Sequence, residues 1–289
     1  MKTIHAAGKA WRFSHTMGRR TAEHNNGVLG GFAWPMALAI APDGNIFVLS
    51  RGWQRVNQAY GMDIFKRIGK TSIDENHFGD FARAEFTWPA GIAVSNDGKV
   101  YVSDEYDNYI KIFEPDKIFP FPLFDEGKES IAKWGEKGSK PGQLGGPSGL
   151  IFDRNDDLLV VDSLNNRIQK FTKDGRFISA FGSAGSGDGQ FNRPWGITVD
   201  RKGDIYVADW GNNRVQKFTP AGKYVMSFGV ITDGGELNHP ADVAVDSDGD
   251  VYVTDWGNDV VKIYEPNGSI IARLEGDGDQ LSKAAALYM

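Results

Sequence analysis

Residue types that commonly carry chemistry are sparse in this chain of 289 residues. It has no cysteine, which excludes a disulfide, a thiolate metal site and a cysteine nucleophile. Three of its histidines, His24, His77 and His239, stand in predicted loops. Three neutral imidazoles around one point would hold a catalytic zinc ion with one open position. Zinc is therefore the first cofactor to consider.

A second candidate metal site is the segment D-S-D-G-D-V at 246–251, where Asp246, Asp248 and Asp250 alternate like the first ligands of a calcium loop. The acidic ligand that closes such a loop is missing, because strand residues follow. Similar short segments recur four times at the same point of a repeating pattern. We therefore interpret the segment as a tight turn, with calcium as the alternative.

The elements that position these residues are short β-strands. Between residues 193 and 229, four β-rich runs are separated by turn residues, which predicts an antiparallel meander of four strands. A proline precedes the first run, and the same frame recurs at intervals of 46 to 58 residues, starting at Pro35, Pro89, Pro147, Pro194 and Pro240. Repeats of this length with four strands each are typical of a β-propeller.

The repeated core resembles the NHL repeat. D-W-G-N-N-R-V-Q-K-F (209–218) and D-S-L-N-N-R-I-Q-K-F (162–171) carry the resemblance most clearly. Weaker copies are D-E-Y-D-N-Y-I-K-I-F (104–113), D-W-G-N-D-V-V-K-I-Y (255–264) and S-R-G-W-Q-R-V-N-Q-A (50–59). The resemblance implies an all-β, NHL-type propeller of six-bladed design. Members of the family bind proteins, bind RNA or, in some relatives, catalyse reactions.

We expect one domain over 1–289, with five complete blades and an N-terminal closing strand. The segment 10–18 matches the fourth strand of a blade, and such a strand closes the ring in many propellers. Because three strands of a sixth blade are missing, we expect a longer natural chain and an open sector in the ring. The expected blades are 34–69, 88–135, 146–182, 193–229 and 239–276.

A repeated aspartate ends the second strand of several blades, and an asparagine follows it in the turn to the third. Short acceptors there can accept hydrogen bonds from backbone N–H groups, and we expect the arginine that follows to reach a neighbouring blade's acidic group. Because these residues recur, we assign them to the scaffold.

Aromatic side chains, by contrast, break the repetition. They lie in loops that join a fourth strand to the next first strand, or a second strand to a third, and both sets open on one face of a propeller. We predict that they line a shallow ligand pocket around the central channel, with packing between loops as the alternative. The seven residues are Trp34, Trp53, Trp88, Tyr106, Trp195, Trp210 and Trp256.

The propeller is also similar to peptidyl-hydroxyglycine amidating lyase, and that resemblance implies metal-binding histidines after the loop proline and in the turn after the second strand. No histidine stands at either position here; the residues after the prolines are Met36, Ala90, Ser148, Trp195 and Ala241. We therefore expect that His24, His77 and His239 do not share a zinc ion.

Charge and composition narrow the partners. The chain has 38 acidic and 32 basic residues, a formal net charge of −6, which disfavours nucleic acid as the partner. No apolar run is long enough for a signal peptide core or a membrane span, so a cytoplasmic location is predicted. We predict a module that binds a small molecule, a peptide or a protein, without a cofactor. The alternatives are a metal-assisted lyase or hydrolase of small substrates and an RNA-binding domain.

Overall fold

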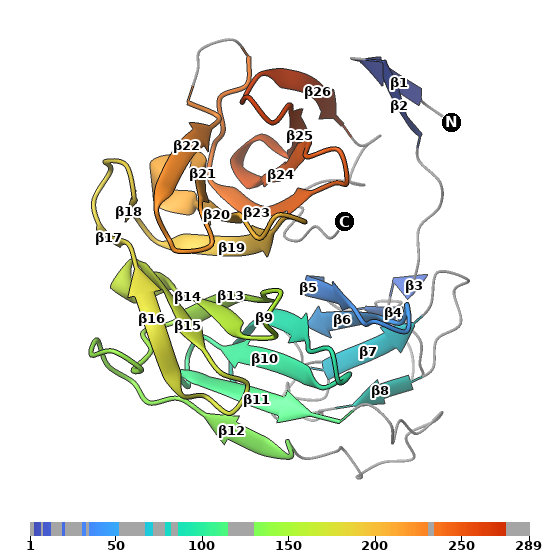
Figure 1. The fold of residues 1–289 in the computed structure, drawn as a ribbon. Helices are drawn as coiled ribbons and strands as arrows, with labels where there is room; N and C mark the ends of the chain where they lie inside the picture. The colour runs from blue at the N-terminus through green and yellow to red at the C-terminus, as the bar shows by residue number, and fades with distance from the viewer. Residues whose placement is uncertain are drawn as a thin grey trace, which may run out of the picture.

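The computed structural model describes residues 3–6, 8–12, 19–20, 31–32, 35–51, 67–71, 79–81, 86–114, 130–230 and 234–275. These residues form five four-stranded sheets and three two-stranded ones. In each four-stranded sheet the strands are antiparallel and adjacent in chain order. The sheets follow one another around a centre, from the blue and green blades in the lower half of Figure 1 to the orange and red blades above. The chain therefore has the predicted all-β propeller fold.

Blades one and two are the sheets nearest the N-terminus. Blade one contains β5 (Pro35–Ile40), β6 (Ile46–Ser50), β7 (Arg67–Thr71) and β8 (Gly79–Phe81). Blade two contains β9 (Pro89–Val94), β10 (Val100–Asp104), β11 (Tyr109–Phe113) and β12 (Ala132–Trp134).

The remaining three blades are closely similar to one another. Blade three contains β13 (Pro147–Phe152), β14 (Leu158–Asp162), β15 (Arg167–Phe171) and β16 (Phe177–Phe181). Blade four contains β19 (Pro194–Val199), β20 (Ile205–Asp209), β21 (Arg214–Phe218) and β22 (Tyr224–Phe228). Blade five contains β23 (Pro240–Val245), β24 (Val251–Asp255), β25 (Val260–Tyr264) and β26 (Ile270–Leu274).

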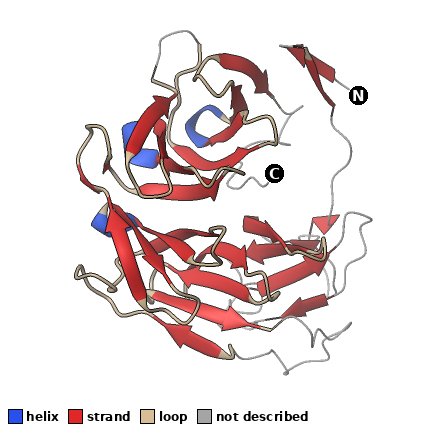
Figure 2. Cartoon of the chain, viewed as in Figure 1, coloured by secondary structure: helices blue, strands red, loops and turns tan. Residues whose placement is uncertain are grey.

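Short 3-10 turns and two-stranded sheets complete the described structure. The 3-10 turns η3 (Ser163–Asn165), η4 (Trp210–Asn212) and η5 (Trp256–Asn258) join second to third strands and are drawn in blue in Figure 2. The two-stranded sheets pair β1 (Thr3–Ala6) with β2 (Lys9–Arg12), β3 (Arg19–Arg20) with β4 (Gly31–Phe32), and β17 (Ser183–Ala184) with β18 (Gln190–Phe191). None of the helices in the described ranges is long and apolar enough to cross a membrane.

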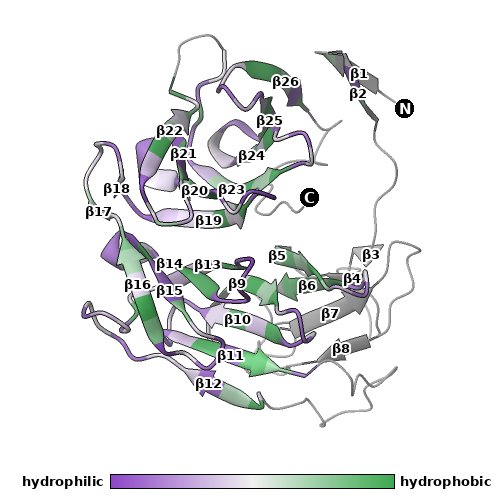
Figure 3. Cartoon of the chain, viewed as in Figure 1, coloured by the Kyte–Doolittle hydropathy of each residue, from purple (hydrophilic) through white to green (hydrophobic). Residues whose placement is uncertain are grey.

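The hydrophobic core is divided into layers, each lying between two neighbouring blades. Every residue of β10, β14, β20 and β24 is buried, because the second strand of a blade is covered on both faces. The fourth strand β16 is mostly exposed. In Figure 3 the hydrophobic colour lies mainly on the strands, including the outer strands β16 and β26, while many of the turns are hydrophilic. Most buried apolar side chains of a blade thus pack against a neighbouring blade.

The tight turns between first and second strands have the geometry that the sequence predicts. In blade four, Oδ1 of Asp200 accepts hydrogen bonds from the backbone N–H groups of Lys202 and Asp204. Gly203 then adopts a φ of 88°, which glycine tolerates without a steric cost. Blade three uses Asp156 instead, with a φ of 60°.

Blade one differs from the prediction. Its third strand is β7, which pairs Arg67 with Ser50, while most of the segment 50–59, the expected weak copy of the repeated core, lies outside the described residues. The blade extends to Phe81 in β8 rather than ending at residue 69. Spacing alone misplaced the third strand because the connection from the second strand is longer here than in the other blades.

The N-terminal segment lies beside the last blade. β2 covers the beginning of the predicted closing strand, but its partner is β1, which the sequence analysis did not anticipate. Ala6 packs on the outer apolar face of blade five, and β1 lies next to β26 (Figure 1). Neighbouring innermost strands pack together from β5 through β23, whereas the described residues of β23 and β5 do not pack closely on each other. The expected open sector of a six-bladed ring stays a prediction.

Candidate functional site

The innermost strands of the five blades surround a cavity of about 450 Å³. Most of its lining residues are aliphatic residues or glycine, with Trp195 and Asp242 among the others, and polar and apolar atoms contribute similarly to its exposed surface. Glycine is needed where strands approach closely. A Cβ on Gly149 would come within 2.6 Å of the carbonyl oxygen of Trp195, and one on Gly196 within 2.2 Å of Oδ1 of Asp242. The cavity is therefore the central channel of the propeller.

Buried carboxylates hold the loops at the mouth of this channel. The second strand of four blades ends on an aspartate that is completely buried: Asp104, Asp162, Asp209 and Asp255. Each accepts a hydrogen bond of 2.6 to 2.8 Å from a backbone N–H group of the loop that leads into its own blade. Burial raises the pKa of Asp209, although hydrogen bonds from Asn192, Asn212 and Arg214 oppose the shift.

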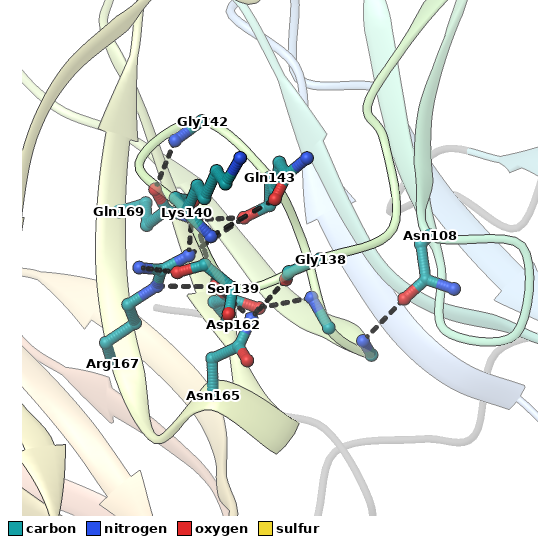
Figure 4. Close-up of polar contacts among 12 residues, drawn as sticks. Asn108, Gly138, Ser139, Lys140, Gly142, Gln143, Asp162, Asn165, Arg167 and Gln169 are labelled. Carbon is teal, nitrogen blue, oxygen red and sulfur yellow. Dashed lines mark hydrogen bonds and ion pairs between the residues drawn. The ribbon is translucent and has the colours of Figure 1, made fainter.

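Blade three shows the whole arrangement (Figure 4). Oδ2 of Asp162 accepts hydrogen bonds from Nε of Arg167 at 2.7 Å and from the amide groups of Asn165 and Gln169 at 2.9 Å. The remaining guanidinium N–H groups donate to three backbone carbonyls between residues 139 and 143, at 2.8 to 2.9 Å. Arginine thus pairs with the aspartate of its own blade, and the prediction that it reaches a neighbouring blade is wrong.

Asparagine connects one blade to the next. In blades two, three and four, the turn between the second and third strands ends on an asparagine. The backbone of this asparagine is left-handed, with φ between 53° and 59°. Its side-chain oxygen accepts a hydrogen bond from the residue just before the next loop proline. The pairs are Asn108 with Gly146, Asn166 with Arg193 and Asn213 with His239, at 2.8 to 2.9 Å. Each of these junctions is thereby fixed at the loop face.

Blades one and two are joined by an ion pair instead. The Arg51 guanidinium donates to Oε2 of Glu105 at 3.2 Å and to the carbonyl of Pro89 at 3.0 Å, and it lies 4.7 Å from the ring centroid of Trp88. Burial lowers the pKa of Arg51 and raises the pKa of Glu105, while the attraction between the two groups opposes both shifts. Blades three to five have no charged residue at the position of Glu105; the equivalent residues are Ser163, Trp210 and Trp256.

The predicted aromatic residues lie in different surroundings. Trp195 lines the channel cavity, while Trp88 packs under Arg51. Tyr106 and Trp256 are exposed on the rim, at 71% and 38%. The ring of Trp210 packs against His239, with centroids 4.2 Å apart. Trp34 and Trp53 lie outside the described residues.

His239 is engaged by its neighbours. Its Nδ1 lies 2.7 Å from Oδ1 of Asn238, and its ring packs on Trp210. His24 and His77 lie outside the described part of the chain, so the question of a shared zinc ion stays a prediction. Among the residues that the structure describes, no group of three or more His, Asp or Glu side chains is arranged to hold a metal ion.

The calcium-like segment forms the predicted turn, and the ammonium group of Lys9, from a distant part of the chain, lies against it. Oδ1 of Asp246 accepts hydrogen bonds from the backbone N–H groups of Asp248 and Asp250. Nζ of Lys9, in β2, lies 2.8 Å from Asp248, 2.5 Å from Asp250 and 3.4 Å from Asp246. Hydrogen bonds from Lys9 to these carboxylates raise its pKa.

Sequence reasoning missed two features of the site. Leu164 is 58% exposed in the turn of blade three that corresponds to the turn of Tyr106 in blade two; a search limited to aromatic residues passed over it. Asp242 is the third residue of its innermost strand, where blades two to four have glycine. An alignment of the five repeats would have revealed that exception.

Comparison with known proteins agrees with this architecture. Residues 86–113, 191–218 and 237–264 match the NHL repeat. The chain is 43% identical over 58 residues to Protein lin-41 of Caenorhabditis elegans, which covers 19% of this chain and 5% of that protein. It is 31% identical over 159 residues to peptidylglycine alpha-amidating monooxygenase of Rattus norvegicus, and this aligned region covers 50% of this chain and 14% of that enzyme. The matches therefore span only a small part of these relatives.

A solved structure of virginiamycin B lyase from Staphylococcus aureus has the same fold. Its TM-score is 0.59 at 17% identity, over 87% of this chain and 73% of that one. The five sheets around a channel thus define a β-propeller. The repeated motif is more specific, because three segments of this propeller, one each in blades two, four and five, match the NHL repeat.

Proposed function

We propose that this propeller is a binding module that holds a peptide or protein partner on its loop face. The supporting observation is an arc of large apolar side chains, one in the turn between second and third strands of each of four consecutive blades. This apolar arc consists of Tyr106, Leu164, Trp210 and Trp256. Three of its members are exposed, at 71% for Tyr106, 58% for Leu164 and 38% for Trp256. Exposed apolar side chains gathered on one face are typical of interaction surfaces.

The scaffold favours this role because it holds the arc in place. Leu164 and Trp210 each follow closely on a buried aspartate, Asp162 or Asp209, whose hydrogen bonds fix the turn and the adjoining loop. A partner that binds a fixed surface does not have to order that surface first, so less of the binding free energy is lost on association.

A displayed library of random peptides tests the proposal. Peptides selected on the wild-type propeller should bind a Tyr106→Ser, Leu164→Ser variant about tenfold or more weakly, because aromatic and aliphatic anchors dominate such interfaces. The matched control is Ile178→Ser with Val225→Ser, which removes two side chains of 43% and 46% exposure from outer strands. Unchanged affinity in the arc variant, or an equal loss in the control, would refute the role of the arc.

The alternative, a metal-assisted lyase, draws on the similarity to the amidating monooxygenase over half of the chain. It requires bound metal, which elemental analysis of the purified protein detects. Zinc in a 1:1 ratio, lost when any one of His24, His77 and His239 is replaced by alanine, would favour the lyase over the binding module.

We also infer a six-bladed design. Two observations support it: β1 packs beside β26 on the outer face of blade five, and the innermost strands β23 and β5 do not pack closely on each other, although the other neighbouring innermost strands do. A small-angle scattering profile of the protein that fits only a closed five-bladed ring would contradict this inference.

A further inference from the structure

Arg193 lies between two members of the apolar arc. Its backbone N–H donates to Oδ1 of Asn166 at 2.8 Å, and Asn166 ends the turn of Leu164 in blade three. The residue before Arg193 is Asn192, whose carbonyl oxygen accepts a hydrogen bond of 2.8 Å from the backbone N–H group that follows Trp210 in blade four. Contacts to both turns therefore place this arginine between Leu164 and Trp210 on the loop face.

The backbone of Arg193 is held in a conformation that favours glycine. Its φ is 51°, and the residues at the same position of blades three and five, Gly146 and His239, have φ values of 60° and 54°. A left-handed backbone is sterically unfavourable for a residue with a Cβ. Arginine at this position therefore has no advantage for folding over the glycine of blade three, and residues held in this way are frequent at binding sites.

The guanidinium of Arg193 is exposed. Among the residues that the structure describes, it has neither a hydrogen bond nor a carboxylate at ion-pair distance. By contrast, the arginines that begin the third strands of blades three and four pair with buried aspartates at 2.7 and 2.9 Å.

Glu105 is the carboxylate on which the charge of Arg193 acts. Burial raises the pKa of Glu105, and attraction from Arg51 and Arg193 opposes this shift. The ion pair of Glu105, however, is with Arg51 at 3.2 Å. A carboxylate of a ligand can therefore pair with Arg193 without first displacing Glu105 from its own partner.

We propose that the loop face binds acidic peptides, in which one carboxylate pairs with Arg193 and apolar side chains on either side of it lie against Leu164 and Trp210. This inference rests on the function proposed above and names the class of partner. A guanidinium can bind a carboxylate through two parallel hydrogen bonds, and arginine and tryptophan are enriched among the residues that dominate interfaces. A nucleic acid is less favoured, because its phosphates attract several cations at once, whereas the formal net charge of this chain is −6.

The displayed library of random peptides also tests this inference. Peptides selected on the wild type should be richer in aspartate and glutamate than peptides selected on Arg193→Gln. One peptide selected on the wild type is then synthesised twice, once with its acidic residue and once with the corresponding amide. By fluorescence anisotropy at one fixed salt concentration, the wild type should bind the acidic form about tenfold or more tightly than the amide form. Arg193→Gln should abolish this difference.

A matched control is available in the same blade. Arg201 is exposed in the turn between β19 and β20, at the other end of the strand that follows Arg193. Arg201→Gln removes the same charge and should leave the preference for the acidic form unchanged. Should Arg193→Gln fold poorly, Arg193→Gly provides the residue that blade three has at this position, Gly146, and glycine accepts the left-handed backbone.

The outcomes separate this inference from the proposed function. If no peptide is selected, or if the Tyr106→Ser, Leu164→Ser variant binds the selected peptides unchanged, the binding module fails and this inference fails with it. Peptides that depend on the arc but show no excess of acidic residues, or that keep their preference for the acidic form in Arg193→Gln, refute this inference alone. A single-stranded RNA of ten nucleotides that binds more tightly than the acidic peptide, and loses that affinity in Arg193→Gln, would assign the arginine to a nucleic acid instead.

Discussion

The ion pair between Asp162 and Arg167 permits a sharp test of how the blade frame is stabilised. Asp162 is completely buried, and 15% of the Arg167 side chain is exposed. Replacing Asp162 by alanine removes the shared acceptor of four donors and leaves the guanidinium without its counter-charge. Breaking such a pair by removing one partner costs about 3 to 5 kcal/mol. Arg167→Ala should cost less, because other donors still reach the carboxylate.

A double-mutant cycle separates the pair from its surroundings. Because the hydrogen bond involves two charged groups, we expect a coupling free energy of about 1.5 to 3 kcal/mol between Asp162→Ala and Arg167→Ala. Urea denaturation followed by circular dichroism measures the four unfolding free energies. The pair of Asp209 and Arg214 in blade four repeats the geometry, with 2.9 Å between Nε and Oδ2, and should give a similar value. Additivity within about 0.5 kcal/mol in both blades would refute the reasoning.

Three further predictions concern the contact of Lys9 with blade five, the ion pair of Glu105 with Arg51, and the packing of Trp210. Replacing Lys9 by methionine removes the cation that lies among three carboxylates, so amide hydrogen exchange in β1–β2 should accelerate; unchanged protection would contradict this contact. Because the pKa of Glu105 is raised above its ordinary value of 4.5, the stability of the wild type relative to Glu105→Gln should fall as pH rises through and above that value. Thermal melts of both proteins between about pH 4 and pH 7 measure this difference. A difference that grows with pH would imply that the attraction of Arg51 outweighs burial. Finally, Trp210→Ala should lower Tm less than Val207→Ala, since Val207 is completely buried; an equal loss would make the tryptophan a structural residue.

The sequence alone determined the repeated frame of the molecule. Each loop proline stands at the start of an innermost strand, from Pro35 to Pro240, and the β-rich runs and turn residues between 193 and 229 predicted the four-stranded meander of blade four. These features were predictable because strands and tight turns depend on residues close together in the chain. The third strand of blade one was misplaced, since the length of its connection has no local signal.

The tertiary structure decided which distant residues meet. Lys9 contacts carboxylates more than 230 residues away, and nothing in either segment specifies the other. Likewise, the place of Asp242 in the channel depends on Gly196 in the neighbouring blade. The partners of such residues depend on how successive blades pack around the axis, because hydrogen bonds and ion pairs act over a few ångströms of space whatever the separation along the chain.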